Sequence, residues 1–287
     1  MTITEGNVKG EPRHQRPDQR TPGQLAFLWL FTFRWHLLAL FLSDLGRSVI
    51  SRKYDAFTTD NGYSDEPVGD NPVTRAIDAV VRGRDTHIAL RQRLDLVTEE
   101  LVATTLSRRG SGPVRLVSGP VGLGRDLRGV WNRLERLGSR PVDWLEVTGI
   151  DLDASGTVLA EASRLARNAG IPLETYQQDM LDAEGLGRVI GGKVDVFNTI
   201  GLSTWLDQTG LEETLGAIRS TLAADGVLVV DHWRHHLGSK YVDALEVPAR
   251  YISDEEFEST LTSCGYVIED KRVTTNSVVV VYRARPD

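Results

Sequence analysis

The stretch V-R-L-V-S-G-P-V-G-L-G-R-D-L, residues 114–127, decides the fold, because a strand pattern runs here straight into a glycine-rich turn and then a helix. This order is typical of the first strand–turn–helix unit of an open α/β sheet, where a ligand lies on the turn and at the helix N-terminus. Gly122 and Gly124 let the backbone come close to a ligand, and Gly119 is expected to adopt a positive φ angle. The turn is therefore a candidate nucleotide-binding site.

Two common phosphate-binding motifs are excluded by the spacing in this turn. A dinucleotide fingerprint, G-x-G-x-x-G, would require glycine at Leu127 or, in the other register, at Val121. A phosphate loop requires Gly-Lys-Ser or Gly-Lys-Thr, whereas Gly124 is followed by Arg125 and Asp126. A glycine turn that holds no ligand remains the alternative interpretation.

The composition of the chain narrows its class. With 287 residues the chain is long enough to bury a sizeable core. Its formal net charge of -7 argues against a nucleic-acid-binding protein, which normally needs a basic surface. A single cysteine, Cys264, excludes an intramolecular disulfide and a cysteine-rich zinc site.

The N-terminal part has two segments of opposite character. Residues 1–23 have the composition of a disordered tail, and no secretory signal is evident. Residues 25–45 form the most apolar stretch, which approaches the roughly 20 residues of a membrane span. Arg34 and His36 at its centre disfavour a span. Two other interpretations are a helix buried against this chain or a partner subunit, and a helix lying in a membrane interface.

The next segments predict a loop followed by helices. Residues 51–71 are rich in turn residues and are expected to form a polar loop. Asn71 and Pro72 resemble a helix N-cap and first helical residue, and apolar spacing predicts helices to about Arg109. We therefore divide the chain into a tail (1–23), an apolar helix with a helical cap (24–110) and a sheet domain (111–287).

Strand and helix patterns alternate from the glycine turn to the C-terminus. Strands are expected at 144–150, 173–177, 194–200, 226–230, 266–272 and 277–282, and helices at 153–169, 211–222 and 254–264. This alternation predicts an α/β fold with a doubly wound, mostly parallel sheet. A turn at Thr275-Asn276 predicts a C-terminal antiparallel hairpin.

The glycine turn resembles the first motif of class I S-adenosylmethionine-dependent methyltransferases, which have a Rossmann-like fold. That motif has an acid, one residue and then three glycines at alternate positions. Gly122 and Gly124 match the last two glycines, whereas Ser118 stands at the acid and Pro120 at the first glycine. The motif is thus degenerate, since a serine offers only a neutral hydrogen bond where the family has a carboxylate.

Later motifs extend the resemblance over residues 113–283. Asp151 follows the second strand, where the family places an acid on the ribose hydroxyls. The alternative is that Asp151 is a helix N-terminal acid, a role that Asp153 also fits. Gln178-Asp179-Met180 resembles the family's adenine motif. Residues 194–207 resemble its fourth motif, which implies that Asn198 lies at the strand end beside the reactive methyl. The resemblance implies S-adenosylmethionine contacts at Ser118, Gly119, Gly122, Gly124, Asp151, Leu152, Asp179, Met180 and Asn198.

Methyl transfer to oxygen or nitrogen also requires loss of a proton, and the best base candidates follow the fifth strand. His232 and His236 are the proposed catalytic residues, with a structural histidine cluster as the alternative and no matching set of metal ligands elsewhere. Aromatic and basic residues on segments expected near the strand ends are candidates for substrate contacts or for packing. These candidates are Tyr54, Tyr63, Trp205 and Arg234.

The sequence therefore predicts a cytoplasmic methyltransferase that uses S-adenosylmethionine and acts on a small or lipophilic molecule. Residues 25–45 are expected to contact a membrane surface or a second copy of the chain. The main alternative is a protein of the same fold that binds the ligand without methyl transfer, as a binding module or a cyclase-like catalyst. Ser118 and Pro120 favour that alternative.

Overall fold

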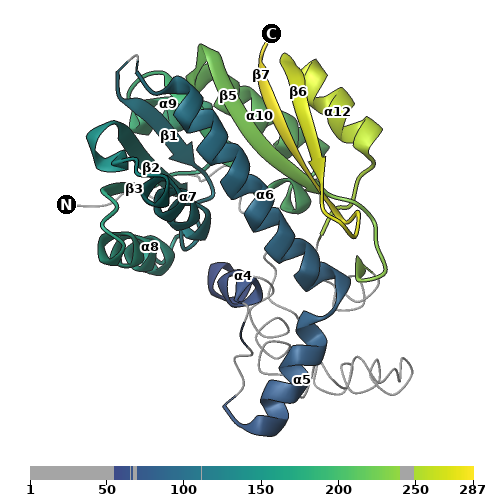
Figure 1. The fold of residues 1–287 in the computed structure, drawn as a ribbon. Helices are drawn as coiled ribbons and strands as arrows, with labels where there is room; N and C mark the ends of the chain where they lie inside the picture. Colours follow the sequence, from purple (N-terminus) through teal and green to yellow (C-terminus); the bar gives the residue numbers. More distant parts are fainter. Residues whose placement is uncertain (1–54, 65, 67–69, 111, 240–248) are drawn as a thin grey trace, which may run out of the picture.

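The computed structural model describes residues 55–64, 66, 70–110, 112–239 and 249–287 (Figure 1). The expected tail at 1–23, the apolar stretch at 25–45 and Tyr54 lie outside the described residues. Among the helices that are described, none combines the length and apolar character needed to cross a membrane.

The described part of the chain is built on one sheet of seven strands in the order β3-β2-β1-β4-β5-β7-β6. The strands are β1 (Val114–Ser118), β2 (Leu145–Asp151), β3 (Leu173–Gln177), β4 (Val194–Thr199), β5 (Leu222–Trp233), β6 (Tyr266–Val273) and β7 (Val279–Pro286). Neighbours among β1 to β5 are parallel, and β7 runs antiparallel to both β5 and β6. The predicted doubly wound sheet with a C-terminal antiparallel hairpin is confirmed.

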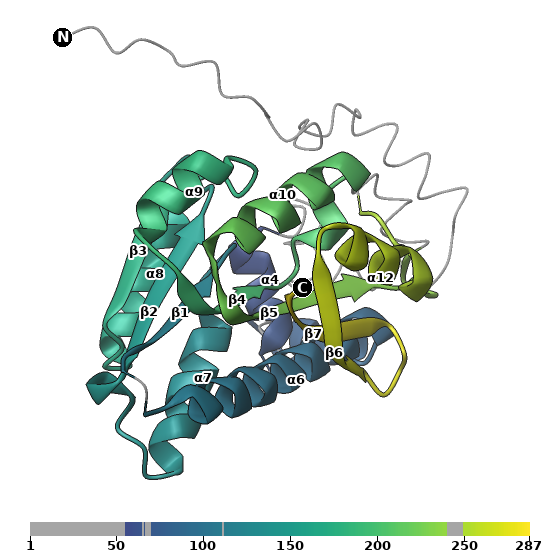
Figure 2. The ribbon, with the colours of Figure 1, turned by 90° about the horizontal axis from the view of Figure 1, so that it is seen from above.

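Helices cover both faces of this sheet (Figure 2). One face packs against α6 (Asp85–Arg108), α7 (Arg125–Arg136) and α8 (Thr157–Asn168). The other packs against α9 (Ala183–Ile190), α10 (Gln208–Thr221) and α12 (Asp254–Ser263). Successive side chains of β5 point to opposite faces of the sheet, so each face has its own apolar core. Val229 packs in the core beneath α6, α7 and α8, whereas Leu228 and Val230 pack in the core beneath α9, α10 and α12.

The predicted helical region at 72–109 consists of two helices. Helix α5 (Pro72–Arg82) begins as expected, with the Asn71 side chain accepting from the Val73 and Thr74 N–H groups and Pro72 in the first turn. Helix α6 buries Val97 and Leu101 in the same core as the strands. It is therefore part of the helical layer of the sheet as well as a connection to α5.

Two helices were not expected from the sequence. Helix α4 (Ala56–Tyr63) lies within the stretch predicted to be a loop, so that prediction was wrong. Its N-cap is Asp55, and its packing buries Thr58 and Gly62, whereas its apolar spacing is weak. Tertiary contacts rather than local pattern stabilise this helix.

The other unexpected helix is α9. Its N-cap is Asp182, whose side chain accepts a hydrogen bond from Gly185 N–H.

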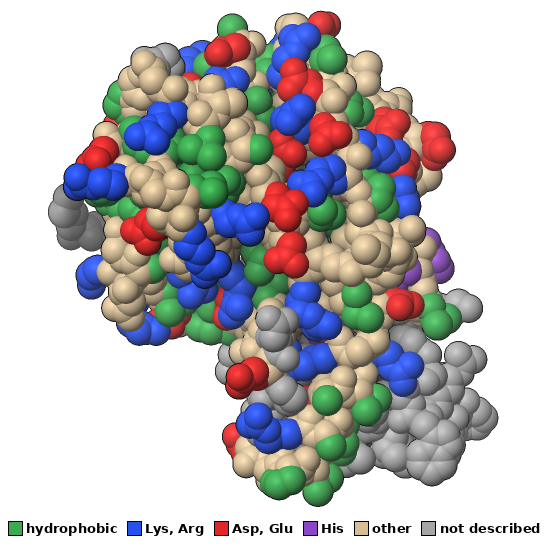
Figure 3. Space-filling view, viewed as in Figure 1, with side chains coloured by type: hydrophobic (Ala, Val, Ile, Leu, Met, Phe, Trp, Pro, Cys, Tyr) green, Lys and Arg blue, Asp and Glu red, His purple; other side chains and the backbone are tan. Residues whose placement is uncertain are grey.

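The outer surface along α6, β6 and β7 carries interleaved positive and negative side chains (Figure 3). Arg283 pairs with Glu100 and Glu269, and Arg272 pairs with Glu99. Charges on this face are therefore neutralised locally, and no large field of one sign covers it.

Candidate functional site

The glycine turn connects the carboxyl end of β1 to the N-terminus of α7. Gly122 and Gly124 both have positive φ angles, +49° and +65°, which a residue with a side chain rarely adopts. Gly122 N–H donates to Asp151 Oδ2 at 2.9 Å, so the turn is held against the carboxyl end of β2. The sequence prediction that these two glycines shape the turn matches the geometry.

Gly119 is required for a different reason from the expected one. The φ angle of Gly119 is not positive, so the expected positive φ was wrong. A Cβ atom at this position would lie 2.7 Å from Met180 Sδ. The lack of a side chain therefore lets the segment after β3 approach the end of β1.

Asp151 and Asp153 have separate roles in the structure. Asp153 accepts from Leu159 N–H and from the Ser155 hydroxyl, and thus stabilises the first turn of α8. Asp151 faces the glycine turn, where it accepts from Gly122 N–H and, at 3.2 Å, from Asp153 N–H. Burial raises the pKa of Asp151, against the opposing effect of these N–H donors. Each carboxylate oxygen can accept a further hydrogen bond from a ligand hydroxyl.

The other predicted cofactor residues lie along the same edge. Asp179 is half-buried after β3 and accepts from Leu181 N–H at 3.0 Å, and Met180 is buried against Gly119. Leu152 directly follows Asp151 and is exposed. The edge therefore presents a carboxylate and an apolar side chain after β3, and a second carboxylate after β2.

A buried polar cluster joins the ends of β1 and β4, and it includes an acid that the sequence reasoning missed. Asn198 Nδ2 donates to Ser118 Oγ at 3.0 Å and also to the Asp126 carboxylate. Ser118 Oγ in turn donates to Asp126 Oδ2 at 3.2 Å. Burial raises the pKa of Asp126, although these hydrogen bonds oppose the shift. The only sequence signal for Asp126 was its place in the first turn of the helix after the glycines.

A second buried cluster joins α4 and α6 to the ends of β4 and β5. Arg93 Nη1 lies 2.9 Å from Asp231 Oδ2, and Arg93 Nη2 donates to the Tyr63 hydroxyl. Asp231 Oδ1 also accepts from Gly201 N–H at 2.6 Å. The guanidinium lies over the rings of Tyr63 and Trp233. Sequence reasoning selected Tyr63, considered Asp231 only as a further metal ligand beside the histidine cluster, and missed Arg93.

The two clusters influence one another electrostatically. Burial raises the pKa of Tyr63, Arg93 opposes that shift, and the charges of both Asp231 and Asp126 add to it. Helix α4, which carries Tyr63, is also held next to the glycine turn, because Asp60 pairs with Arg125 Nε at 2.7 Å. Figure 1 shows α4 below the carboxyl ends of the strands. The two clusters, α4 and the glycine turn thus form one candidate site.

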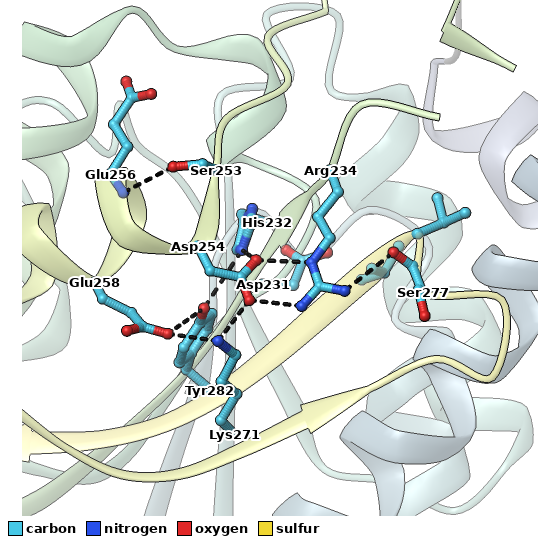
Figure 4. Close-up of polar contacts among 12 residues, drawn as sticks. Asp231, His232, Arg234, Ser253, Asp254, Glu256, Glu258, Lys271, Ser277 and Tyr282 are labelled. Atoms are coloured by element: carbon cyan, nitrogen blue, oxygen red, sulfur yellow. Dashed lines mark hydrogen bonds and ion pairs between the residues drawn. The ribbon is translucent and has the colours of Figure 1, made fainter. Parts of the chain in front are cut away.

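His232 lies on the opposite face of β5 from Asp231 (Figure 4). Its Nε2 is 3.2 Å from Asp254 Oδ1 and 3.4 Å from the Tyr282 hydroxyl, and its ring stacks on Phe257. Burial lowers the pKa of His232, with Asp254 opposing. The side chain is only 1% exposed and is turned toward α12, away from the two buried clusters.

Arg234 belongs to the same network as His232. It makes a bidentate pair with Asp254, with Nε at 2.7 Å and Nη2 at 2.5 Å from the two carboxylate oxygens. Lys271 also pairs with Asp254, and Arg234 holds the pKa of that carboxyl well below its usual range. Arg234 is thus engaged with α12 rather than grouped with Tyr63.

The remaining predicted residues are spread over neighbouring segments. His236 Nε2 lies 2.9 Å from Thr86 Oγ1, and the His236 ring packs against Trp233. Trp205 is half-buried in the short helix η2 (Ser203–Trp205) that follows β4. No three His, Cys, Asp or Glu side chains gather as a metal site within the described part of the chain.

Comparisons with known proteins identify the fold. No family model and no curated protein matches the sequence. Among solved structures, a possible exported protein from Bordetella parapertussis matches with a TM-score of 0.70 and 17% identity, over 88% of this chain and 86% of that chain.

Two methyltransferase structures also match. Magnesium protoporphyrin IX methyltransferase from Synechocystis PCC 6803 with bound SAH matches with a TM-score of 0.57 and 16% identity, over 84% of this chain and 97% of that chain. Mitomycin 7-O-methyltransferase matches with a TM-score of 0.52 and 16% identity, over 91% and 70% of the two chains. The sheet order and these similarities together show that the chain has the fold of the class I S-adenosylmethionine-dependent methyltransferases.

Proposed function

We propose that the protein is an S-adenosylmethionine-dependent methyltransferase that acts on a small or lipophilic molecule. The observation that carries this proposal is the row of polar groups along the carboxyl ends of β3, β2, β1 and β4, which includes Asp151 against the glycine turn. Carboxyl ends of parallel strands are where ligands bind in open α/β sheets. A cytoplasmic location and a membrane or dimer contact through residues 25–45 are part of the proposal.

The row of groups fits the parts of the cofactor in order. Asp179 and Met180 after β3 would receive the adenine, and Asp151 after β2 would accept from the ribose hydroxyls. The glycine turn after β1 leaves the backbone open to the rest of the ligand. The cofactor's reactive end would then lie near Asn198 at the end of β4.

The cluster of Arg93, Tyr63 and Asp231 provides the acceptor side. It stands next to the end of β4, since Asp231 binds Gly201, three residues after Asn198. Arg93 Nε is buried and has no hydrogen-bond partner, which leaves one N–H for a substrate oxygen. We propose that Arg93 and Tyr63 orient the acceptor, so that alignment is the main contribution to catalysis.

The chemistry is simple in atomic terms. Bound S-adenosylmethionine supplies a methyl group on a positively charged sulfur, which keeps the electron pair of the broken S–C bond. The acceptor atom forms the new bond to carbon, and an oxygen or nitrogen acceptor gives up its proton. His232 was the base candidate, but its packing against Asp254 and Phe257 supports a structural role. Because His232 Nε2 faces Asp254 and Tyr282 (Figure 4), we do not assign this proton to it.

A second candidate function is ligand binding without methyl transfer. Arg93 and Tyr63 are hydrogen-bonded to each other in this structure, and Ser118 and Pro120 depart from the family motif. A protein of this kind would bind S-adenosylmethionine tightly and leave it intact.

One experiment distinguishes the two functions. The full chain is incubated with S-adenosylmethionine and a small-molecule extract, and the products are analysed by mass spectrometry. The methyltransferase proposal predicts S-adenosylhomocysteine together with a product heavier by one methylene unit. An Asp151→Ala variant, in which cofactor binding should be weaker, serves as the control and should form less product at a low S-adenosylmethionine concentration. Tight binding of S-adenosylmethionine with no product from any extract would overturn methyl transfer and favour the binding function.

A further inference from the structure

The Asp126 carboxylate is a buried negative charge without a positive partner. Its hydrogen-bond donors are all neutral: the side chains of Ser118 and Asn198 and the backbone N–H groups of Leu127 and of Asp126 itself. The nearby cations are engaged elsewhere, because Arg125 and Arg128 both pair with Asp60. Within the described ranges no Lys, Arg or His forms an ion pair with Asp126. Burying a carboxylate costs free energy unless a cation or several donors compensate for it.

The side-chain oxygen of Asn198, beside this carboxylate, accepts no hydrogen bond. Its Nδ2 is used by Ser118 and Asp126, which fixes the orientation of the amide. Its Oδ1 is buried and has no hydrogen-bond partner, and the whole residue is 1% exposed. Buried amide oxygens are normally satisfied, so an acceptor left over next to a buried carboxylate indicates that a donor is missing.

A cation with more than one N–H would compensate both groups. A water molecule would satisfy Asn198 but would not neutralise Asp126. An ammonium group does both, because it has a positive charge and three N–H donors. Asp126 and Asn198 come from α7 and β4 and meet at the end of β1.

We infer that Asp126 and Asn198 hold the ammonium group of the methionine part of S-adenosylmethionine. The inference rests on the proposed function, which places adenine near β3 and ribose near β2 and leaves the amino-acid end over β1 and β4. Ser118 stands where the family motif has its acid, and its hydroxyl instead supports the Asp126 carboxylate. The acid is thus supplied by α7 rather than by β1.

The test compares two ligands of which only one has the amino-acid part that carries the ammonium group. S-adenosylhomocysteine contains the ammonium, whereas 5′-methylthioadenosine has the same adenosine and thioether without the amino-acid part. Calorimetry on the full chain measures both ligands with the wild type and with Asp126→Asn. We expect Asp126→Asn to weaken S-adenosylhomocysteine binding by about tenfold to a hundredfold and to leave methylthioadenosine binding unchanged.

Further variants control for folding and for the helix terminus. Asp85→Asn removes an exposed acid from the first turn of α6 and should change neither affinity. Ser118→Asp in the Asp126→Asn background puts an acid back at the end of β1 and should restore part of the lost affinity. If Asp126→Asn fails to fold, Asn198→Ala tests the same site, with a selective loss of S-adenosylhomocysteine binding expected.

The outcomes separate this inference from the proposed function. If the wild type binds neither ligand, the proposed function is wrong and the inference is overturned with it. If the wild type binds both ligands and Asp126→Asn weakens neither, or weakens both by the same factor, only the ammonium site is wrong.

Discussion

Arg93 and Asp231 form a buried ion pair at the carboxyl edge of the sheet, with Nη1 2.9 Å from Oδ2 and side-chain exposures of 5% and 0%. The pair connects α6 to β5, and through Tyr63 and Gly201 it reaches α4 and the end of β4. It therefore positions four elements of the candidate site. The planar guanidinium is suited to this, since it bonds to two partners in fixed directions.

Breaking this pair should destabilise the protein strongly. Asp231→Asn removes the negative charge and leaves Arg93 buried without compensation, which costs about 3 to 5 kcal/mol in proteins. Urea denaturation followed by circular dichroism measures the change. The matched control is Arg164→Ala, which removes an exposed pair with Glu161 and should have almost no effect. Equal, small changes in both variants would contradict the structural role of Arg93 and Asp231.

Stability should also depend on pH through His87, which is buried in α6. Burial lowers its pKa from 6.5 to about 4, and the charges of Arg82 and Arg91 add to the shift while Asp78 opposes it. His87 is protonated more readily in the unfolded chain than in the folded protein. The free energy of unfolding therefore decreases as the pH falls from 6.5 toward about 4. The full effect is as much as about 3 kcal/mol.

The measurement for His87 is the free energy of unfolding across this pH range. His87→Gln should flatten the decrease that the wild type shows, because the group that takes up the proton on unfolding is gone. His235→Gln, at an exposed histidine, should follow the wild type. A His87→Gln variant with an unchanged pH dependence would show that other groups cause the decrease.

His232→Ala separates a structural histidine from a catalytic one. Its ring packs against Phe257 and Tyr282, so truncation should leave a cavity and lower stability by about 2 to 4 kcal/mol. S-adenosylhomocysteine affinity should remain unchanged at a temperature where the variant is folded. A hundredfold loss of turnover with no loss of stability would instead support a general base.

The sequence predicted the fold well because the relevant signals are local. Strand periodicity, the glycine turn and the Asn71–Pro72 start of α5 each depend on a few adjacent residues. The hairpin of β6 and β7 was likewise expected from a turn signal.

The polar clusters of the site were much harder to predict. Arg93 and Asp231 lie 138 positions apart in the sequence, and no local pattern pairs them. Asp126 looked like an ordinary acid in a helix first turn, and only the folded chain places it against Ser118 and Asn198. His232 lies near a strand end, which suggested chemistry, whereas in the structure its ring contacts Asp254 and Phe257 of α12.

The most direct test of the proposed cofactor site is calorimetry of S-adenosylhomocysteine binding to the wild type and to Asp151→Ala. We expect a wild-type complex and an affinity about tenfold to a hundredfold weaker for the variant, because a charged hydrogen bond to the ribose is lost. No binding to the wild type, or equal affinity for the wild type and Asp151→Ala, would contradict this site.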